Sequence, residues 1–243
     1  MNLCLEETLG RLQPERLKHK VRQGQERWEW ISHRLGPEGR KGIERLIEIG
    51  SGEGTFLEVA RNYVQKAVGI DFNPLFITYC QEKGLEVIKG EWPLTLPEGR
   101  FDFAAMFHVA EHLSDPIACL RQVKNVLGEG GYLCMETPDV WRPVGNLQKT
   151  FLGPDHVFLL SEGTLEPFLA KAGFEVIAIE PVELGIRALA RPREGLPVEW
   201  KPQPAARLRR RFRLHQIRWH LIAEWREWLA RRWSGGKARA KLD

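Results

Sequence analysis

The sequence predicts an α/β fold built on a doubly wound, mostly parallel sheet of seven strands with helices on both faces. Two observations support this prediction. Short apolar segments alternate with amphipathic segments between Leu46 and Arg191, a pattern typical of parallel strands joined by crossover helices. The apolar run from Leu46 to Ile49 also leads into glycines and then into a helix-like segment from Thr55, which is the strand, loop and helix unit of such sheets.

Each expected strand is a short run rich in Val, Ile, Leu or Phe that ends at turn-forming residues. The turn from Pro181 to Gly185 is too short for a helical crossover, so the last strand is expected to return antiparallel. The seven strands are expected near residues 45–50, 66–71, 85–89, 101–107, 131–136, 174–180 and 185–191.

Residues 1–44 are expected to form helices ahead of the sheet. Apolar residues recur at helical spacing from Leu9 to Ile31, before a break at Gly36–Gly39. We interpret this segment as an N-terminal helical cap on the domain of residues 45–191, although a packing extension or a dimer surface fits the pattern as well. Residues 138–160 have no clear period, and a loop of that length predicts part of a substrate entrance.

The C-terminal part of the chain has its own composition. Four prolines in residues 192–204 predict a stiff linker. Residues 205–243 carry apolar residues at helical spacing among twelve Lys or Arg and only three acids, so this amphipathic helical tail has a net charge of +9 and the rest of the chain −5. Three roles fit the tail: packing on the domain or within a homodimer, contact with an anionic membrane surface, or binding of RNA phosphates.

Length and composition indicate a cytoplasmic protein. The 243 residues suffice for one α/β domain with extensions. The four cysteines are scattered without metal-ligand spacing, so we expect free thiols in a reducing compartment and no metal cluster. Glu6 and Glu7 interrupt the first apolar residues, and no run of eighteen apolar residues follows, so neither a signal peptide nor a membrane span is expected.

The glycine-rich segment after the first strand predicts a site for a nucleoside cofactor. Gly50, Gly52 and Gly54 have no Cβ, so a ligand can lie against this backbone, and the amides that open the next helix favour a carboxylate or phosphate. Asp71 ends the second expected strand, 21 residues after Gly50. An acid at that place accepts hydrogen bonds from ribose hydroxyls in doubly wound sheets.

Two details distinguish the type of cofactor. The glycine spacing is G-x-G-x-G, whereas a dinucleotide pyrophosphate is associated with G-x-G-x-x-G. Glu48 lies two residues before Gly50, where dinucleotide sites are usually apolar, and an acid there suits a ligand that carries an ammonium group. A nicotinamide-dependent dehydrogenase is therefore disfavoured.

With these residues the chain resembles class I S-adenosylmethionine-dependent methyltransferases, and most of all the group around the ubiquinone-pathway O-methyltransferases. The resemblance covers roughly residues 46–180. Beyond the glycine loop and Asp71 it includes the segments Gly90–Leu94, Phe101–Phe107, Glu111–Pro116, Gly130–Pro138, Asp155–His156 and Ala172–Val176.

This resemblance implies a Rossmann-like methyltransferase fold with S-adenosylmethionine as cofactor. The glycine loop, including Ser51, is then expected to hold the methionine end, with Glu48 near its ammonium group and Asp71 on the ribose. The adenine is expected to contact Phe72 and Trp92, with Glu91 on its amino group. Trp92 precedes a proline and fits core packing equally well.

The end of the fourth strand is expected to face the transferred methyl group, because ligands of open α/β sheets bind beyond the carboxyl ends of the strands. Phe107 is expected beside the cofactor there. The candidate catalytic residues are His108, Glu111, His112 and His156, and His108 is the preferred general base. His156 is expected to reach in from the loop, oriented by Asp155.

These observations predict methyl transfer to the oxygen of a small hydroxylated acceptor, such as a quinone-like, lipid-linked or sugar molecule. An RNA methyltransferase is an alternative, although no Asn-Pro-Pro-Tyr type of motif follows the fourth strand. A protein that binds S-adenosylmethionine without catalysis is a further alternative that the glycine loop does not exclude.

Overall fold

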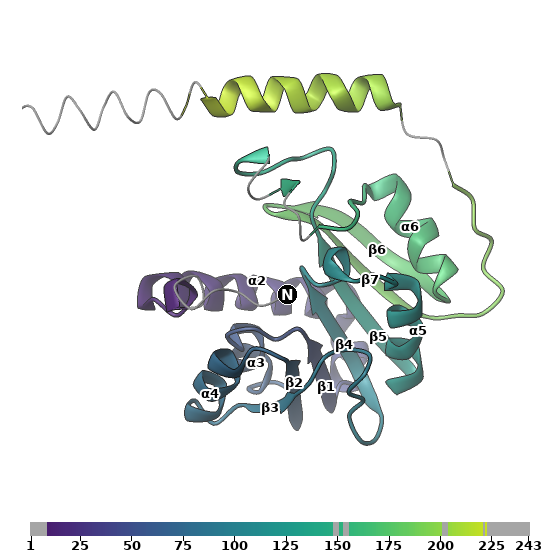
Figure 1. Cartoon of the computed structure of the whole chain (residues 1–243). Coiled ribbons are helices and arrows are strands. Elements are labelled where there is room, and N and C mark those ends of the chain that lie inside the picture. Colours follow the sequence, from purple (N-terminus) through teal and green to yellow (C-terminus); the bar gives the residue numbers. More distant parts are fainter. Residues whose placement is uncertain (1–8, 148–150, 153–155, 201–203, 221, 223–243) are drawn as a thin grey trace, which may run out of the picture.

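A computed structural model describes residues 9–147, 151–152, 156–200, 204–220 and 222. Seven strands form one sheet in this part of the chain, as the sequence predicts (Figure 1). The fifth strand begins earlier than expected, since it also includes residues 127–130. The strands are β1 (Arg45–Ile49), β2 (Lys66–Asp71), β3 (Glu86–Lys89), β4 (Phe101–Phe107), β5 (Leu127–Thr137), β6 (Phe174–Val182) and β7 (Gly185–Pro192).

The order of the strands positions the site. The sheet runs β3-β2-β1-β4-β5-β7-β6, and β7 is antiparallel to both of its neighbours, as the short turn at residues 181–185 predicts. From β1 the chain builds the sheet outward through β2 to β3, and it then returns to place β4 on the other side of β1. This reversal leaves a crevice outside the carboxyl ends of β1 and β4, where ligands of such sheets bind.

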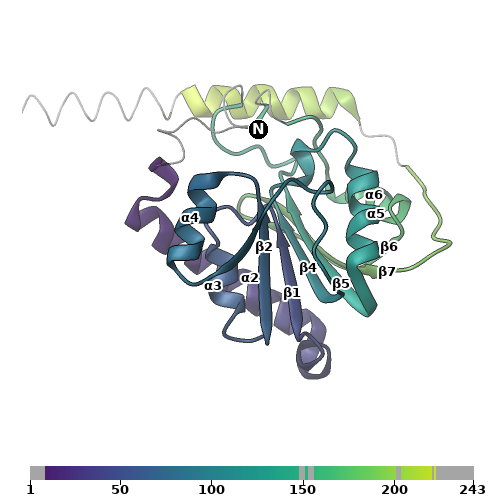
Figure 2. The ribbon, with the colours of Figure 1, turned by 60° about the horizontal axis from the view of Figure 1, so that its bottom comes forward.

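Helices cover both faces of the sheet, which gives three layers (Figure 2). Buried side chains of α2, α3 and α4 pack on one face, and those of α5 and α6 pack on the other. The helices are α2 (Pro14–Lys41), α3 (Thr55–Ala60), α4 (Pro74–Glu82), α5 (Pro116–Val126) and α6 (Glu162–Lys171), with a short 3-10 turn η1 (Ala110–His112) after β4.

The two faces of the central strands follow the twofold alternation of a strand. On β4, Phe103 and Phe107 pack toward α2 and α3, whereas Ala104 and Met106 pack toward α5 and α6. On β1, Leu46 packs toward α2. The alternation puts Glu48 on that same side, where the side chain of Arg27 from α2 influences it. Glu48 and Arg27 therefore lie on the face that α2 covers.

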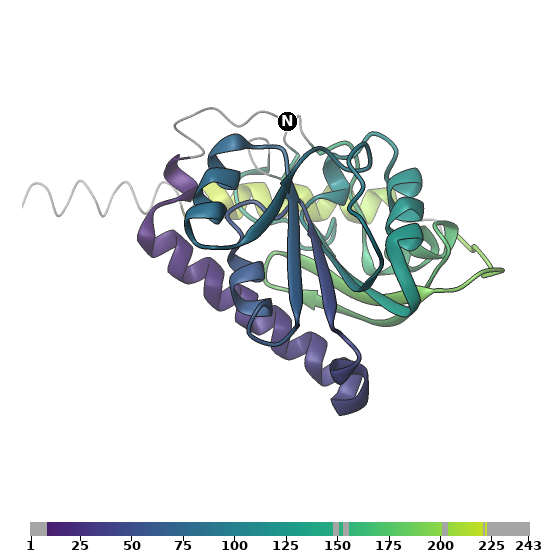
Figure 3. The same cartoon turned by 90° about the horizontal axis from the view of Figure 1, so that it is seen from below.

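The N-terminal segment is dominated by one long helix rather than several short ones. Helix α2 runs diagonally across the sheet (Figure 3) and is kinked at Gly36, which has φ 68° and ψ −179°. Glycine reaches this conformation without steric cost, so the break expected at residues 36–39 appears as a kink. The helix buries Trp28 and Ile31 against the sheet.

Residues 205–220 of the tail form a helix beside the irregular segment that precedes α6 (Figure 1). Phe212 contacts Phe151 edge to face, with ring centroids 6.0 Å apart. His215 Nε2 lies 2.8 Å from the carbonyl oxygen of Gly145. The guanidinium of Arg207 lies over the ring of Trp141. This part of the tail therefore packs on the protein's own loop. The remaining tail residues, including Trp225, Trp228 and Trp233, lie outside the described part.

None of the helices in the described part of the chain combines the length and the apolar character that a membrane span needs.

Candidate functional site

A cavity of about 660 Å³ lies outside the carboxyl ends of β1, β2 and β4. Most of the residues predicted for the site line it. They are Glu48, Gly50, Ser51, Gly52, Asp71, Phe72, Glu91, Trp92, Phe107, His108 and His112. Three predicted residues, Gly54, Glu111 and His156, are not among the lining residues.

The glycine loop is a tight turn locked to the sheet. The amides of Gly50 and Ser51 both donate to the carbonyl oxygen of Ile70 on β2, at 2.8 and 3.1 Å. Gly50 has φ 69°, and a Cβ there would approach Val109 Cγ2 to 2.4 Å. Any larger residue would therefore be strained and would clash. The same argument explains Gly54, which caps α3 and faces Cys80 rather than the cavity.

Asp71 holds the loop in place through its carboxylate. One oxygen accepts the amide of Gly52 at 2.8 Å and the other accepts the amide of Asn73 at 2.8 Å. Burial raises the pKa of Asp71 above its ordinary value, although the two amides work in the opposite direction. Each carboxylate oxygen retains a second lone pair, so Asp71 can still accept hydrogen bonds from a ligand in the cavity.

Glu48 is a buried acid with an unsatisfied oxygen. It is 4% exposed, and its Oε2 has no hydrogen-bond partner in the described structure. Burial is the main reason that the pKa of Glu48 rises to about 8; Arg27 opposes this shift, and Asp71 adds to it. A buried acid without a partner costs free energy, and a cationic ligand in the cavity would supply the missing partner.

The predicted adenine side of the cavity combines exposed and buried residues. Phe72 is 40% exposed and Glu91 is exposed, so both are accessible to a ligand. Trp92 is different, because its ring belongs to the hydrophobic core and its indole N–H donates to the carbonyl oxygen of Cys119 at 3.1 Å. Trp92 offers the cavity only a small part of its surface, and core packing explains most of its role.

His108 stands at the end of β4 between two buried carboxylates. Its Nδ1 lies 3.4 Å from Glu111 Oε1, and its Nε2 lies 3.8 Å from Glu136 Oε2. His108 also has φ 56°, and in the described structure it is alone among residues other than glycine in taking a positive φ. Such a conformation costs on the order of 1 kcal/mol, and residues held in this way cluster at functional sites.

The carboxylate of Glu111 is fully buried and does not reach the cavity. Its Oε2 accepts the hydroxyl of Thr137 at 3.3 Å, and Oε1 faces His108. Glu111, predicted as a candidate catalytic residue, is thus not among the residues that line the cavity. The position behind His108 suits a residue that orients the histidine ring.

His112 and His156 meet each other, with ring centroids 4.9 Å apart. Together with Glu111 they place one potential ligand atom each within 4.8 Å of the others, a grouping that the sequence spacing did not indicate. His156 does not line the cavity, and its Nδ1 lies 2.8 Å from the carbonyl oxygen of Phe151. Asp155, expected to orient it, lies outside the described residues.

Helix α2, part of the segment interpreted as an N-terminal cap, adds site residues that the sequence prediction did not name. A stripe of four polar residues from this helix lines the cavity: Arg16, Lys20, Gln23 and Arg27. Their spacing of four, three and four residues puts them on one helix face. This helical spacing of polar residues is visible in the sequence and could have identified them as site residues.

Arg27 connects α2 to the sheet beneath the cavity. Its guanidinium donates two hydrogen bonds to Glu136 Oε2, at 3.0 and 2.6 Å, and lies 4.1 Å from the centroid of the Phe107 ring. Arg187 of β7 donates to the other oxygen of Glu136 at 2.5 Å. Burial opposes ionisation of Glu136, but the two guanidiniums outweigh it and hold the pKa of Glu136 below its ordinary value.

Glu53 of the glycine loop forms a second group of ion pairs at the cavity, with Arg11 and Lys20. The carboxylate of Glu53 accepts hydrogen bonds from Arg11 at 2.5 Å and from Lys20 at 2.8 Å. Two residues of the N-terminal segment therefore bind the glycine loop. Burial disfavours the charge on Glu53, yet Lys20 and Arg11 prevail, and the pKa of Glu53 is lowered. The N-terminal segment is therefore part of the site's wall.

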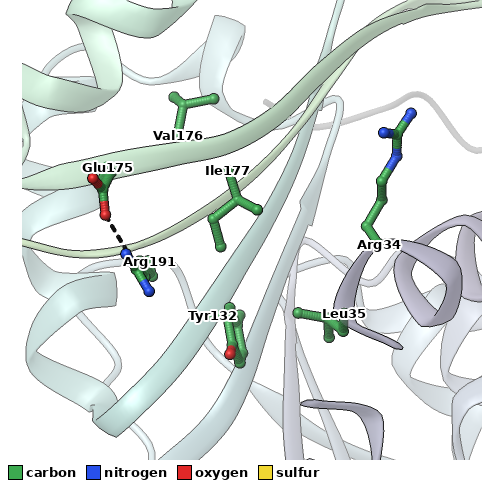
Figure 4. Close-up of a pocket in the computed structure, with 7 residues that line it drawn as sticks. All are labelled: Arg34, Leu35, Tyr132, Glu175, Val176, Ile177 and Arg191. Atoms are coloured by element: carbon green, nitrogen blue, oxygen red, sulfur yellow. Dashed lines mark hydrogen bonds and ion pairs between the residues drawn. The ribbon is translucent and has the colours of Figure 1, made fainter. Parts of the chain in front are cut away.

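A smaller, open cavity of about 330 Å³ lies away from this site, beside β6 (Figure 4). An ion pair between Glu175 and Arg191 spans one side of it. None of the residues predicted for the site is among its lining residues, which are Arg34, Leu35, Tyr132, Glu175, Val176, Ile177 and Arg191. The chemistry of the site belongs to the larger cavity.

Comparison with known proteins agrees with this geometry. A family model described as a methyltransferase domain matches residues 19–179, from α2 to β6. The chain belongs to this methyltransferase family. Residues 19–179 therefore form a methyltransferase domain, and S-adenosylmethionine is the cofactor that this family implies.

Several relatives give the family context. A probable S-adenosylmethionine-dependent methyltransferase of Mycolicibacterium smegmatis is 27% identical over 136 residues, covering 54% of this chain and 52% of the relative. A tRNA U34 carboxymethyltransferase of Shewanella loihica is 27% identical over 195 residues, covering 72% and 55%. A ubiquinone biosynthesis O-methyltransferase of Xanthomonas axonopodis pv. citri is 28% identical over 119 residues, covering 46% and 48%.

The resemblance to the ubiquinone-pathway group is thus distant, and this chain spans about half the length of the curated relatives it matches. Among solved structures, a SAM-dependent methyltransferase from Aquifex aeolicus superposes with a TM-score of 0.56 at 22% identity, covering 78% of this chain and 98% of that one. This likeness shows a shared fold.

The residues of the cavity fit the cofactor. Glu48 offers a buried acid with an orphaned oxygen, which suits an ammonium group, and Asp71 retains acceptor capacity for ribose hydroxyls. The two acids lie at the ends of adjacent strands, β1 and β2.

Proposed function

We propose that the protein methylates a hydroxyl oxygen of a small acceptor bound in the cavity at the end of β4, with His108 as the general base. The observation that supports this most strongly is the placement of His108. It lines the cavity in a strained backbone conformation and stands between Glu111 and Glu136, so a proton taken up by its ring lies beside two carboxylates.

The cofactor end of the cavity is proposed to lie over β1 and β2. When bound, S-adenosylmethionine supplies a methyl group on a positively charged sulfur, which is a good leaving group. Glu48 binds the ammonium group, Asp71 binds the ribose, and Phe72 contacts the adenine with Glu91 beside it. Phe107 forms an apolar wall near the acceptor, packed against Phe56.

The acceptor end then needs little covalent help from the protein. The protein has to hold the hydroxyl oxygen in line with the methyl carbon and to remove the hydroxyl proton. An imidazole nitrogen of His108 takes this proton, Glu111 orients the ring, and Arg27 keeps Glu136 in place. In this scheme His108 is the catalytic residue, and Glu111, Glu136 and Arg27 are positioning residues.

The substitution His108→Asn tests the proposal. Asparagine tolerates a positive φ, so the fold is expected to persist while the base is lost. We expect kcat to fall at least about 100-fold, the usual contribution of a general base, with an unchanged dissociation constant for S-adenosylmethionine. Methyl transfer would be measured with labelled cofactor on hydroxylated quinones, sugars and lipid-linked phenols. Full activity of the variant would contradict the role of His108.

Two other functions make different predictions. An RNA methyltransferase gains some support from the Shewanella relative and from the arginines of residues 205–220, and it predicts retention on a tRNA column that salt abolishes. A protein that binds the cofactor without catalysis predicts normal cofactor binding and no turnover with any acceptor. The O-methyltransferase proposal predicts turnover and no salt-sensitive tRNA retention.

A further inference from the structure

Three potential metal ligands meet where the irregular segment before α6 touches η1. Glu111 and His112 belong to η1, and His156 follows 44 residues after His112. The amide of Val157 donates to the carbonyl oxygen of Glu111 at 2.8 Å, so the two segments are joined at this point. One side-chain ligand atom of each residue lies within 4.8 Å of the others.

The ring of His156 is oriented as in many metal sites. Its Nδ1 lies 2.8 Å from the carbonyl oxygen of Phe151, a contact that places the proton on Nδ1. The lone pair of Nε2 is then left for another partner. Metal-binding histidines are commonly fixed by such a hydrogen bond from the second ring nitrogen to a backbone carbonyl.

Glu111 supplies a second, independent indication. Its side chain is fully buried, and Oε1 has no hydrogen-bond partner among the described residues, although His108 Nδ1 is 3.4 Å away. Oε2 is held by the Thr137 hydroxyl. A buried carboxyl oxygen without a partner costs free energy, and a cation would supply that partner.

We propose that Glu111, His112 and His156 bind one divalent first-row transition-metal ion, and that Zn²⁺ is the ion the ligands suit best. Two imidazoles and one carboxylate are typical of zinc sites that keep an open position, whereas Mg²⁺ and Ca²⁺ prefer oxygen ligands. Ligand atoms of a tetrahedral Zn²⁺ site lie about 3.4 Å apart. The three ligand atoms lie within 4.8 Å of one another, so each pair needs to close in by at most about 1.4 Å.

The location of this metal site gives it a consequence for the cavity. His112 is also a lining residue of the large cavity, so an ion bound to it would lie close to the space proposed for the acceptor. The ion would also tie the segment around His156 to η1. The site therefore links loop position to the acceptor end of the cavity.

Metal binding can be tested without any acceptor. The full-length, untagged protein would be stripped with EDTA and titrated with ZnCl₂ by calorimetry, and we expect one ion per chain. His156→Ala and His112→Ala should each weaken Zn²⁺ binding at least about tenfold. His33→Ala is the matched control, because His33 is exposed on α2 outside the cluster, and it should bind like the wild type.

Thermal unfolding by circular dichroism would show that each variant is folded. Co²⁺ in place of Zn²⁺ gives a readout that needs no variant, since visible bands without a thiolate charge-transfer band indicate nitrogen and oxygen ligands. Wild-type binding that equals that of both His variants, or a thiolate band, would overturn the proposal. Either result leaves the proposed methyl transfer intact, because the assay contains no acceptor.

Discussion

Glu48 and Asp71 show how burial and neighbouring groups decide the chemistry of two acids at the ends of adjacent strands. Asp71 receives two backbone amides, whereas Glu48 keeps one oxygen without a partner. Glu48 thus has a pKa of about 8 in the folded protein and carries a proton at neutral pH. A ligand's ammonium group favours the carboxylate, so we expect cofactor binding at pH 7 to release this proton.

The raised pKa of Glu48 predicts a characteristic dependence of stability on pH. The folded state holds a proton that the unfolded chain loses above pH 4.5, so this contribution is present at low pH and disappears as the pH rises toward 8. The slope is roughly 1.4 kcal/mol per pH unit. Glu48→Gln removes the titrating group, so its free energy of unfolding should not show this loss. In urea unfolding, the stability of the variant relative to the wild type should increase as the pH rises from 5 to 8.

Calorimetry provides the matching test on binding. Titrations of the cofactor in two buffers of different ionisation enthalpy should reveal proton release for the wild type and none for Glu48→Gln. Parallel stability curves for the two proteins from pH 5 to 8 would show that Glu48 is ionised in the folded state. That outcome would contradict the description of the site.

At the scale of elements, α2 is bound to the sheet through a buried ion network that involves Arg27, Glu136 and Arg187. Arg27→Met should lower the free energy of unfolding by about 2 kcal/mol, less than the 3–5 kcal/mol typical of a broken buried pair, because Glu136 keeps Arg187. Arg22→Met, at an exposed position of the same helix, is the control and should stay within about 0.5 kcal/mol of the wild type. If urea unfolding showed the same loss of stability for Arg27→Met and Arg22→Met, the claim that this ion network stabilises the fold would be contradicted.

The tail helix has two different sides in its described part. Phe212 and His215 face the segment before α6, whereas Leu214 and Ile217 are half exposed among arginines. We propose that this exposed side contacts an anionic membrane surface, which would suit a lipid-linked acceptor.

Sedimentation with vesicles tests the membrane proposal. The full chain should pellet with phosphatidylcholine vesicles that contain phosphatidylserine, and much less with phosphatidylcholine alone. Deletion of residues 205–243 should leave the protein in the supernatant. Equal sedimentation of the two proteins would remove the argument for lipid contact and leave packing on the loop as the tail's role.

For the whole molecule, the sequence was sufficient to predict the fold because local patterns carry the information. The strands expected near 45–50 and 66–71 appear at Arg45–Ile49 and Lys66–Asp71, and the antiparallel return at residues 181–185 follows from chain length alone. The glycine loop and Asp71 have a spacing that fixes them on neighbouring strands.

What the sequence did not reveal depends on contacts between distant parts of the chain. Arg27 and Glu136 are 109 residues apart, and nothing local marks them as partners. His156 lies in a segment without periodicity, so its meeting with His112 follows only from the path of that segment. The role of Trp92 turned on burial, which a single position in a sequence does not determine.

The central claim is that the turn at residues 50–54, Glu48 and Asp71 together hold the cofactor. A crystal structure of the protein with S-adenosylmethionine tests this most directly. We predict electron density in the cavity beyond β1 and β2, with the ribose hydroxyls on the carboxylate of Asp71 and the ammonium group near Glu48. An empty cavity at saturating cofactor, or density in the cavity beside β6, would contradict the account.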